Sequence, residues 1–135
     1  MRWSRKTIAL LVACLLLCAT TTACKPGSKP PVKLTANDNG SKQALAVGQK
    51  LLVTLDANLT TGYQWSVDGS LPGQLKQVGS VLYSAQSNAI GGQGSDLWTF
   101  VGASAGSGML KLKYSRSFEP TATPAKMFEV QVDVR

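Results

Sequence analysis

This 135-residue chain offers few of the residue combinations on which enzymatic chemistry depends. It contains no histidine, which excludes a Ser-His-Asp triad, a Cys-His pair and any metal site with histidine ligands. Its seven acidic residues are scattered along the sequence without an evident pair for acid–base catalysis. We therefore predict a protein that is not an enzyme and that holds no metal or other cofactor.

The cysteines indicate a different chemistry, because all three lie in the first 24 residues. Basic residues there precede an unbroken apolar run from Ile8 to Ala19, which is too short to span a bilayer but is typical of a signal-peptide core. Ala23 before Cys24 resembles the lipobox of bacterial lipoproteins, in which this cysteine is diacylated and becomes the mature N-terminus. Thr21 stands where leucine is usual.

We predict a lipoprotein-type signal peptide over residues 1–23 and lipidation of Cys24; the alternative is ordinary signal-peptidase cleavage that leaves a free thiol. Residues 24–40 are rich in proline, glycine and polar residues, which predicts a flexible linker behind the anchor. Lys25 directly after the cysteine fits outer-membrane retention. We expect an exported protein anchored in a bacterial cell envelope, at the outer membrane or the periplasmic face.

Three segments of the remaining chain have the composition of ordered loops. In the first, residues 58–65, Asn58 can close an Asx-turn, Thr60 and Thr61 stiffen the tip, and Gly62 permits a positive φ. The second, Gly91-Gly92-Gln93-Gly94, has no following lysine or helix and so is not a phosphate-binding loop. The third, residues 114–120, places Arg116 and Phe118 near a loop tip, and arginine and aromatic residues are typical of interface hot spots. Each segment taken alone is equally compatible with a turn that has no function.

The apolar residues around these loops recur with a period of two, which predicts strands that bury one face. The pattern is clearest at Leu51, Val53 and Leu55, and again from Phe128 to Val134. Turn signals separate six to eight such segments. We predict an all-β fold, an immunoglobulin-like β-sandwich of about seven strands over residues 41–135.

The formal charge of +7 is concentrated near the N-terminus. Residues 34–135 contain eight Lys and Arg residues and seven acidic residues, so the net charge of the domain is close to zero. Because so few phosphates would be neutralised, we do not expect nucleic-acid binding.

The order and spacing of the three loops resemble the chagasin family of cysteine-peptidase inhibitors. That family's motifs are Asn-Pro-Thr-Thr-Gly-Tyr-x-Trp, a Gly-x-Gly-Gly loop and Arg-Pro-Trp. The first motif is matched from Asn58 to Trp65, with Leu59 in place of proline; the second is matched at Gly91 and Gly94, with Gln93 in place of the middle glycine. In the third, Arg116 is kept, while Ser117 and Phe118 replace proline and tryptophan.

The resemblance implies a sandwich that inserts three loops into the active-site cleft of a papain-like cysteine peptidase. It implies a monomer and assigns peptidase binding to the loop residues Asn58, Leu59, Thr60, Thr61, Gly62, Tyr63, Gly91, Gly92, Gln93, Gly94, Arg116, Ser117 and Phe118. Because two loop prolines and the tryptophan are replaced, we expect weaker inhibition than in a member with intact motifs. The alternative is a non-inhibitory envelope lipoprotein whose sandwich is a binding or structural module.

Overall fold

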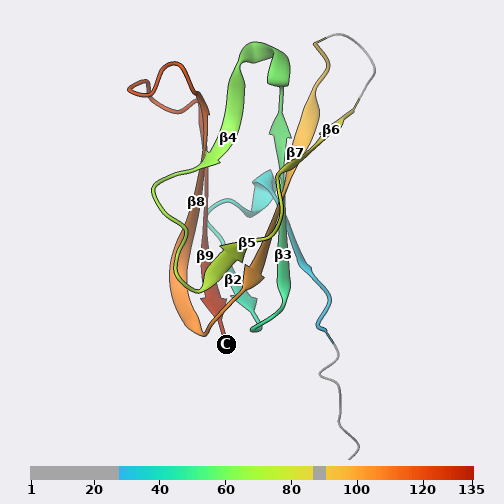
Figure 1. Ribbon diagram of the computed structural model, residues 1–135, viewed down its shortest axis with the longest axis vertical. Coiled ribbons are helices and arrows are strands. Elements are labelled where there is room, and N and C mark those ends of the chain that lie inside the picture. The colour runs from blue at the N-terminus through green and yellow to red at the C-terminus, as the bar shows by residue number, and fades with distance from the viewer. Residues whose placement is uncertain (1–27, 87–90) are drawn as a thin grey trace, which may run out of the picture.

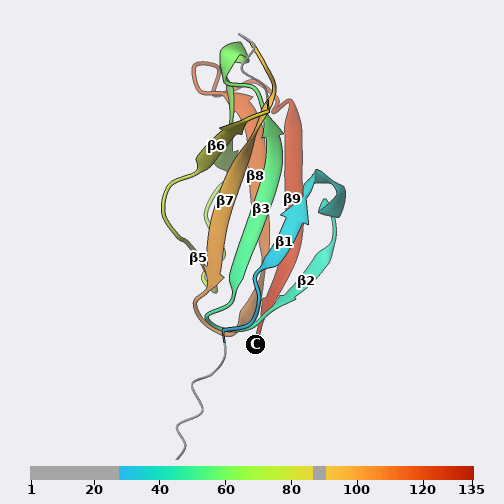
Figure 2. The same cartoon turned by 90° about the vertical axis from the view of Figure 1, so that its right-hand side faces the viewer.

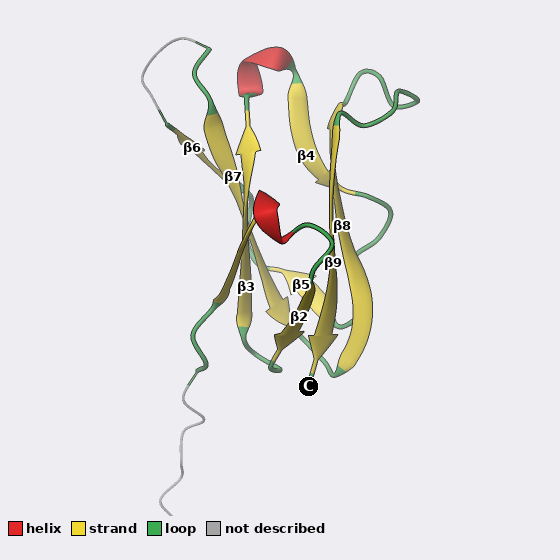
Figure 3. Ribbon diagram, turned by 180° about the vertical axis from the view of Figure 1, so that it is seen from behind, coloured by secondary structure: helices red, strands yellow, loops and turns green. Residues whose placement is uncertain are grey.

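The computed structural model describes residues 28–86 and 91–135, which form a β-sandwich (Figure 1). The predicted signal peptide, Cys24 and the first residues of the predicted linker lie outside the described residues. The helical turns among the described residues are two short 3-10 turns, η1 (Ala36–Asp38) and η2 (Leu59–Thr61), coloured red in Figure 3. The prediction of an all-β fold is confirmed.

The strands form two sheets that face each other. The first sheet has the order β1 (Val32–Thr35), β3 (Lys50–Ala57), β7 (Gly94–Gly102) and β5 (Leu75–Gln77), with β6 (Leu82–Ala85) also pairing with β7. The second has the order β2 (Lys42–Leu45), β9 (Lys126–Val134), β8 (Gly106–Arg116) and β4 (Tyr63–Val67). We call them the β3–β7 sheet and the β8–β9 sheet.

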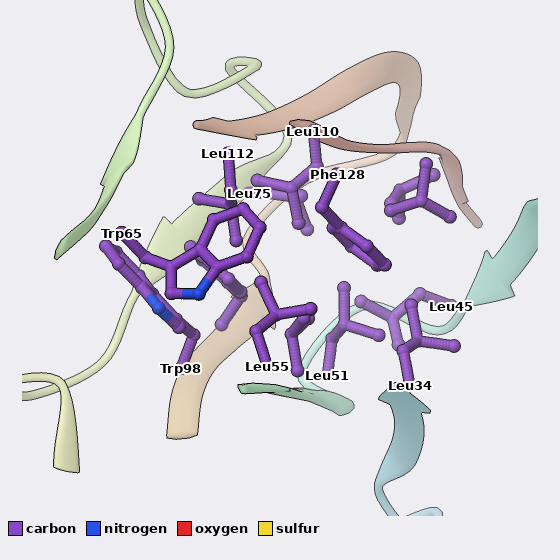
Figure 4. Packing of buried hydrophobic residues seen from close by; sticks show 14 of the residues in the cluster. Leu34, Leu45, Leu51, Leu55, Trp65, Leu75, Trp98, Leu110, Leu112 and Phe128 are labelled. Carbon is purple, nitrogen blue, oxygen red and sulfur yellow. The ribbon is translucent and has the colours of Figure 1, made fainter. Parts of the chain in front are cut away.

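The core lies between the sheets because each long strand alternates buried and exposed residues. In β3 the buried residues are Leu51, Val53, Leu55 and Ala57, and in β9 every second residue from Phe128 to Val134 is buried. Trp65 and Trp98 lie at the same end of this cluster, whereas Leu34 and Leu45 lie at the other (Figure 4). The predicted period of two is therefore what places these side chains in one core.

Two details differ from the sequence prediction. Residues 28–86 and 91–135 form nine strands where about seven are expected, because the short strands β1 and β5 have too few residues for a period to predict them. Residues 32–38 were assigned to the flexible linker, but Val32–Thr35 pairs in parallel with Leu51–Thr54 and buries Leu34. The side chain of Asp38 then accepts a hydrogen bond from the backbone N–H of Thr35 at 2.8 Å, so η1 is also ordered. The ordered domain therefore begins before residue 41.

The two ends of the sandwich carry different parts of the chain. The turn at η2, the β6–β7 loop and the β8–β9 loop gather at one end, at the top of Figure 1. The chain enters the domain at the opposite end, beside the C-terminus and the turn between β2 and β3 (Figures 1 and 2). We call these the loop end and the tether end.

Within the part of the chain that the structure describes, no helix is long and apolar enough to cross a membrane.

We expect a fragment of residues 28–135 to fold on its own, because it contains every residue of the hydrophobic core. A fragment of residues 41–135 should be less stable by at least about 2 kcal/mol, since it loses the buried side chain of Leu34 and the strand that covers the edge of β3. Urea unfolding followed by circular dichroism measures the difference. Equal stability of the two fragments would place β1 outside the folding unit.

Candidate functional site

The tip of the first loop is a 3-10 turn that Asn58 caps. Its side-chain Oδ1 accepts hydrogen bonds from the backbone N–H of Thr60 at 3.0 Å and from the Thr60 hydroxyl at 2.6 Å. The Thr61 hydroxyl donates to the backbone carbonyl of Asn58 at 2.8 Å, and Gly62 ends the turn with φ 76°. The expected Asx-turn and positive φ are therefore confirmed, and the tip is held by its own side chains.

Tyr114 in β8 fixes this turn to the opposite sheet. Its hydroxyl accepts a hydrogen bond from the backbone N–H of Asn58 at 2.9 Å, and its ring stacks on Tyr63 with 5.4 Å between centroids. On the other side, the ring lies 5.1 Å from that of Trp65, whose indole N–H donates to the carbonyl of Asp56 at 3.0 Å. The segment that crosses from the β3–β7 sheet to the β8–β9 sheet is therefore fixed by two side-chain to backbone hydrogen bonds. Tyr114 holds Asn58, and Trp65 holds Asp56.

The glycine loop is the hairpin between β6 and β7, and residues 87–90 within it are outside the described part. The N–H of Gln86 donates to the carbonyl of Gln93 at 3.0 Å, and Gly91 has φ 82°. The side-chain amide of Asn58 donates to the carbonyl of Gly91 at 3.4 Å, which joins this loop to the first. At Gly94, a Cβ atom would lie 2.6 Å from the backbone carbonyl oxygen of Ser84 and would also clash with the Tyr83 ring, so only glycine fits there.

Beneath this hairpin, β7 carries a buried carboxylate on the side that faces the core. Asp96 is 7% exposed, with Leu55 and Tyr83 as its neighbours across the strands. Burial raises the pKa of Asp96 above the ordinary carboxylate value. Because the folded state then binds the proton more tightly than the unfolded state, this residue favours folding below its ordinary pKa. That contribution is lost as the pH rises through the folded-state pKa.

In the third loop, Arg116 is held in place while Phe118 projects. The guanidinium carbon of Arg116 lies 4.6 Å from the centre of the Tyr63 ring, and its Nη1 is 3.4 Å from a carboxylate oxygen of Glu119. Phe118 is 67% exposed, and its ring lies 5.7 Å from the same guanidinium and alongside Gly62. Contacts of Phe118 and Arg116 with Gly62 and Tyr63 therefore join the first and third loops.

The residues predicted to bind a peptidase, where the structure describes them, all lie at the loop end. They differ in how far their side chains are exposed to solvent. Leu59, 54% exposed, and Phe118 project with Thr60 and Thr61 into solvent, together with the backbone around Gly91–Gln93. Gly94 is buried within β7, whereas Tyr63 and Arg116 are half-buried at strand ends. Their assignment to peptidase binding remains a prediction; the geometry gives these three a supporting position.

Three further residues of the site were not predicted as site residues. Tyr114 and Glu119 flank the third motif and hold the loops through the contacts above, and Asp96 lies under the glycine loop. The one signal in the sequence was the position of Asp96 among inward-facing residues of an alternating strand, where a carboxylate is unexpected.

Two hollows adjoin the loop end among the described residues, and the larger, lined in part by Arg116 and Ser117, measures about 260 Å³. The smaller, beneath the first loop and lined in part by Asp56, Gln93 and Lys126, measures about 50 Å³, which is room for about one or two water molecules. No cluster of three or more metal-ligating side chains occurs among residues 28–86 and 91–135. The arrangement is suited to contact with another protein surface.

Comparison with known proteins agrees with this geometry. The model of the chagasin family of peptidase inhibitors (I42) matches residues 44–132. No curated protein sequence gives a significant match.

Several solved structures are similar in fold. The cysteine protease inhibitor EhICP2 from Entamoeba histolytica has a TM-score of 0.70 at 20% identity, over 78% of this chain and 96% of that one. Amebosin has a TM-score of 0.62 at 31% identity, over 78% of this chain and 99% of its own. PbICP-C, solved in complex with falcipain-2, has a TM-score of 0.51 at 22% identity, over 80% and 93% of the two chains.

We expect Gly62→Ala to displace Phe118, because the added Cβ would lie 3.1 Å from Phe118 Cε1. The matched control is Gly69→Ala, since Gly69 has nearly the same φ, 77°, and no atom near its Cβ position. Both variants should lose about 1 kcal/mol of stability through left-handed backbone strain. Only Gly62→Ala should change the NMR shifts of the Phe118 ring. An unchanged ring signal would contradict the coupling of the first and third loops.

Proposed function

The chain belongs to the chagasin family of peptidase inhibitors, and on this basis we propose that it blocks the active-site cleft of papain-like cysteine peptidases with its three loops. It is an inhibitor and not an enzyme, in agreement with the absence of histidine and of catalytic carboxylate pairs. The observation that carries the proposal is that three motif-bearing loops lie at one end of the sandwich (Figure 1) and that the first contacts the other two, through Asn58 to Gly91 and through Gly62 to Phe118.

The first loop is suited to occupy a cleft without being cleaved. Papain-like enzymes accept peptides in an extended conformation beside a thiolate nucleophile. Residues 59–61 are instead wound into a 3-10 turn, closed at both ends by Asn58 and Gly62. A bond within this turn is therefore not presented in the extended geometry that attack requires.

The neighbouring loops supply two further contact surfaces. Gly91 and Gly92 present backbone without side chains, so another surface can approach closely. On the other side Phe118 presents an aromatic ring, and Arg116 holds the strand end beneath it through Tyr63 and Glu119. Because these loops are already joined to one another, little conformational entropy remains to be lost on binding.

Two of the similar structures support this choice of target class. EhICP2 is a cysteine protease inhibitor, and PbICP-C was solved in complex with falcipain-2. A standard interface buries about 800 Å² on each partner, which three joined loops can supply. We propose that this chain binds its target as a monomer, with one loop end for each active site.

We also propose that the protein is an exported lipoprotein of a bacterial cell envelope, anchored through a diacylated Cys24. The sequence before Cys24 supports this, and so does the fold, because the chain enters the domain at the end opposite the loops (Figure 2). Residues 25–31 extend to about 25 Å at most, so the anchor would hold the tether end toward the membrane. Lys25 favours retention at the outer membrane, and the loops would then face away from the bilayer.

We expect the fragment of residues 28–135 to inhibit papain stoichiometrically and to leave a serine peptidase unaffected. Phe118→Ala should raise the inhibition constant about tenfold or more, because this exposed aromatic ring lies beside the first loop and is of the type that anchors interfaces. The control is Val47→Ala, which removes a side chain of similar exposure, 56%, at the tether end.

Inhibition is measured by titrating active papain, and folding of each variant by circular dichroism. Equal inhibition by the parent and Phe118→Ala would show that the third loop is not part of the interface. Complete lack of inhibition by the folded parent would favour the non-inhibitory binding module.

The replaced proline of the first motif gives a second prediction. Leu59 is the first residue of η2, and Asn58 before it is extended, with φ −136° and ψ 102°, which suits a following proline. The N–H of Leu59 donates no hydrogen bond within the described residues. Leu59→Pro should therefore raise stability by about 0.4–1 kcal/mol and tighten inhibition of papain several-fold. A loss of stability would mean that residue 59 does not have proline-compatible geometry.

A further inference from the structure

Lysines without ion-pair partners are concentrated on one part of the domain. All seven acidic residues lie in the described part of the chain, and four of them pair with cations, in Lys42–Asp133, Lys111–Glu129, Lys113–Asp68 and Arg116–Glu119. Three of these pairs involve lysines of the β8–β9 sheet, so its outer face is balanced in charge. None of the ion pairs among the described residues involves Lys33, Lys50 or Lys76.

Strand register places these three lysines together on the outer face of the β3–β7 sheet. Lys50 and Lys76 both stand opposite Val101, one on each side of β7, so their Cα atoms are about 10 Å apart. Lys33 stands opposite Leu52, the next outward residue after Lys50 in β3. We call these three residues the tether-end lysine patch.

One acidic side chain lies beside the patch, since the Asp38 carboxylate accepts a hydrogen bond from the N–H of Thr35, two residues along β1 from Lys33. The carboxylate on the same face of β3 is that of Asp56, six residues along the strand from Lys50, or about 20 Å away. That distance exceeds the screening length of about 8 Å at physiological salt. Asp38 therefore offsets at most one of the three lysine charges, and the patch keeps a positive excess although the domain as a whole is nearly neutral.

Apolar side chains lie among and beside these lysines. Leu52 and Val101 are half-buried between them, and Val47 is 56% exposed in the turn that precedes Lys50. Lys29 lies at the same end, beside Gln49 and Arg135. A cationic surface with a few exposed aliphatic groups is suited to the headgroup region of a lipid bilayer.

From this geometry we propose that the tether-end lysine patch docks on an anionic phospholipid surface. The occupant is a membrane because the described chain begins at this end of the domain (Figures 1 and 2), only four residues after Cys24, and this choice rests on the lipid anchor proposed above. Docking fixes the orientation of the sandwich and directs the loop end away from the bilayer. The patch does not involve the three loops, so the inference is independent of peptidase inhibition.

The test uses the fragment of residues 28–135, which lacks the predicted lipid and signal peptide, in sedimentation with vesicles. We expect binding to phosphatidylcholine vesicles that contain about 30% phosphatidylglycerol, weak binding to pure phosphatidylcholine, and release at about 0.5 M salt. The variant Lys33→Gln/Lys50→Gln/Lys76→Gln should bind at least about tenfold more weakly.

The matched control is Lys42→Gln/Lys111→Gln/Lys113→Gln, which changes the net charge equally but removes the paired lysines of the other sheet. It should bind anionic vesicles nearly as tightly as the parent, because the lysines that it removes lie on the opposite face of the sandwich. Circular dichroism checks that both variants fold, and papain inhibition should be the same for all three proteins.

Equal weakening by the two triple variants would overturn the proposal, because net charge and not the patch would then determine binding. Binding to a short DNA duplex that is tighter than binding to the vesicles at the same salt would also overturn it, in favour of a polyanion site. Vesicle-bound protein that no longer inhibits papain, while free protein does, would contradict the proposed orientation.

Discussion

The arrangement of the loop end depends on the contact between Tyr114 and the first loop. β3 and β4 belong to different sheets, so the chain between them must cross the open end of the sandwich. The Tyr114 hydroxyl accepts the N–H of Asn58 while its ring is packed between Tyr63 and Trp65. The crossing segment is therefore fixed against the β8–β9 sheet, and Asn58 in turn holds the 3-10 tip and reaches Gly91 in the next loop.

This arrangement separates residues that support the surface from residues that present it. Tyr63, Arg116 and Gly94 carry motif positions, yet they are half-buried or buried and contact their own domain. Leu59 and Phe118 are exposed on top of them. A motif residue can thus serve either the geometry of its own loop or contact with a partner. The positions at which this chain differs from the family pattern are mainly exposed ones.

Charge is distributed unevenly over the domain, although its net charge is close to zero. Ion pairs neutralise the outer face of the β8–β9 sheet, whereas the lysines at the tether end of the β3–β7 sheet have no such partners. Residues that are far apart in sequence, such as Lys50 and Lys76, become neighbours only through their common partner Val101. Binding surfaces for a peptidase and for a bilayer can then coexist at opposite ends of a small domain.

The sequence by itself determined the fold class, the core and the three loops, because an apolar period of two and the motif spacing are local properties of the chain. It also determined that Gly62 has a positive φ and that Asn58 caps a turn, since these follow from short-range chemistry. The sequence did not reveal β1, because an apolar alternation over only four residues within a proline-containing segment is too short to predict a strand, and these residues gain their order by pairing with β3. Only the tertiary structure decided that Tyr114 holds the first loop, that Phe118 lies against Gly62 and that three lysines share one face. Each of these contacts joins residues separated by 17 or more positions, and sheet register and the packing of two sheets, not any local preference, bring them together.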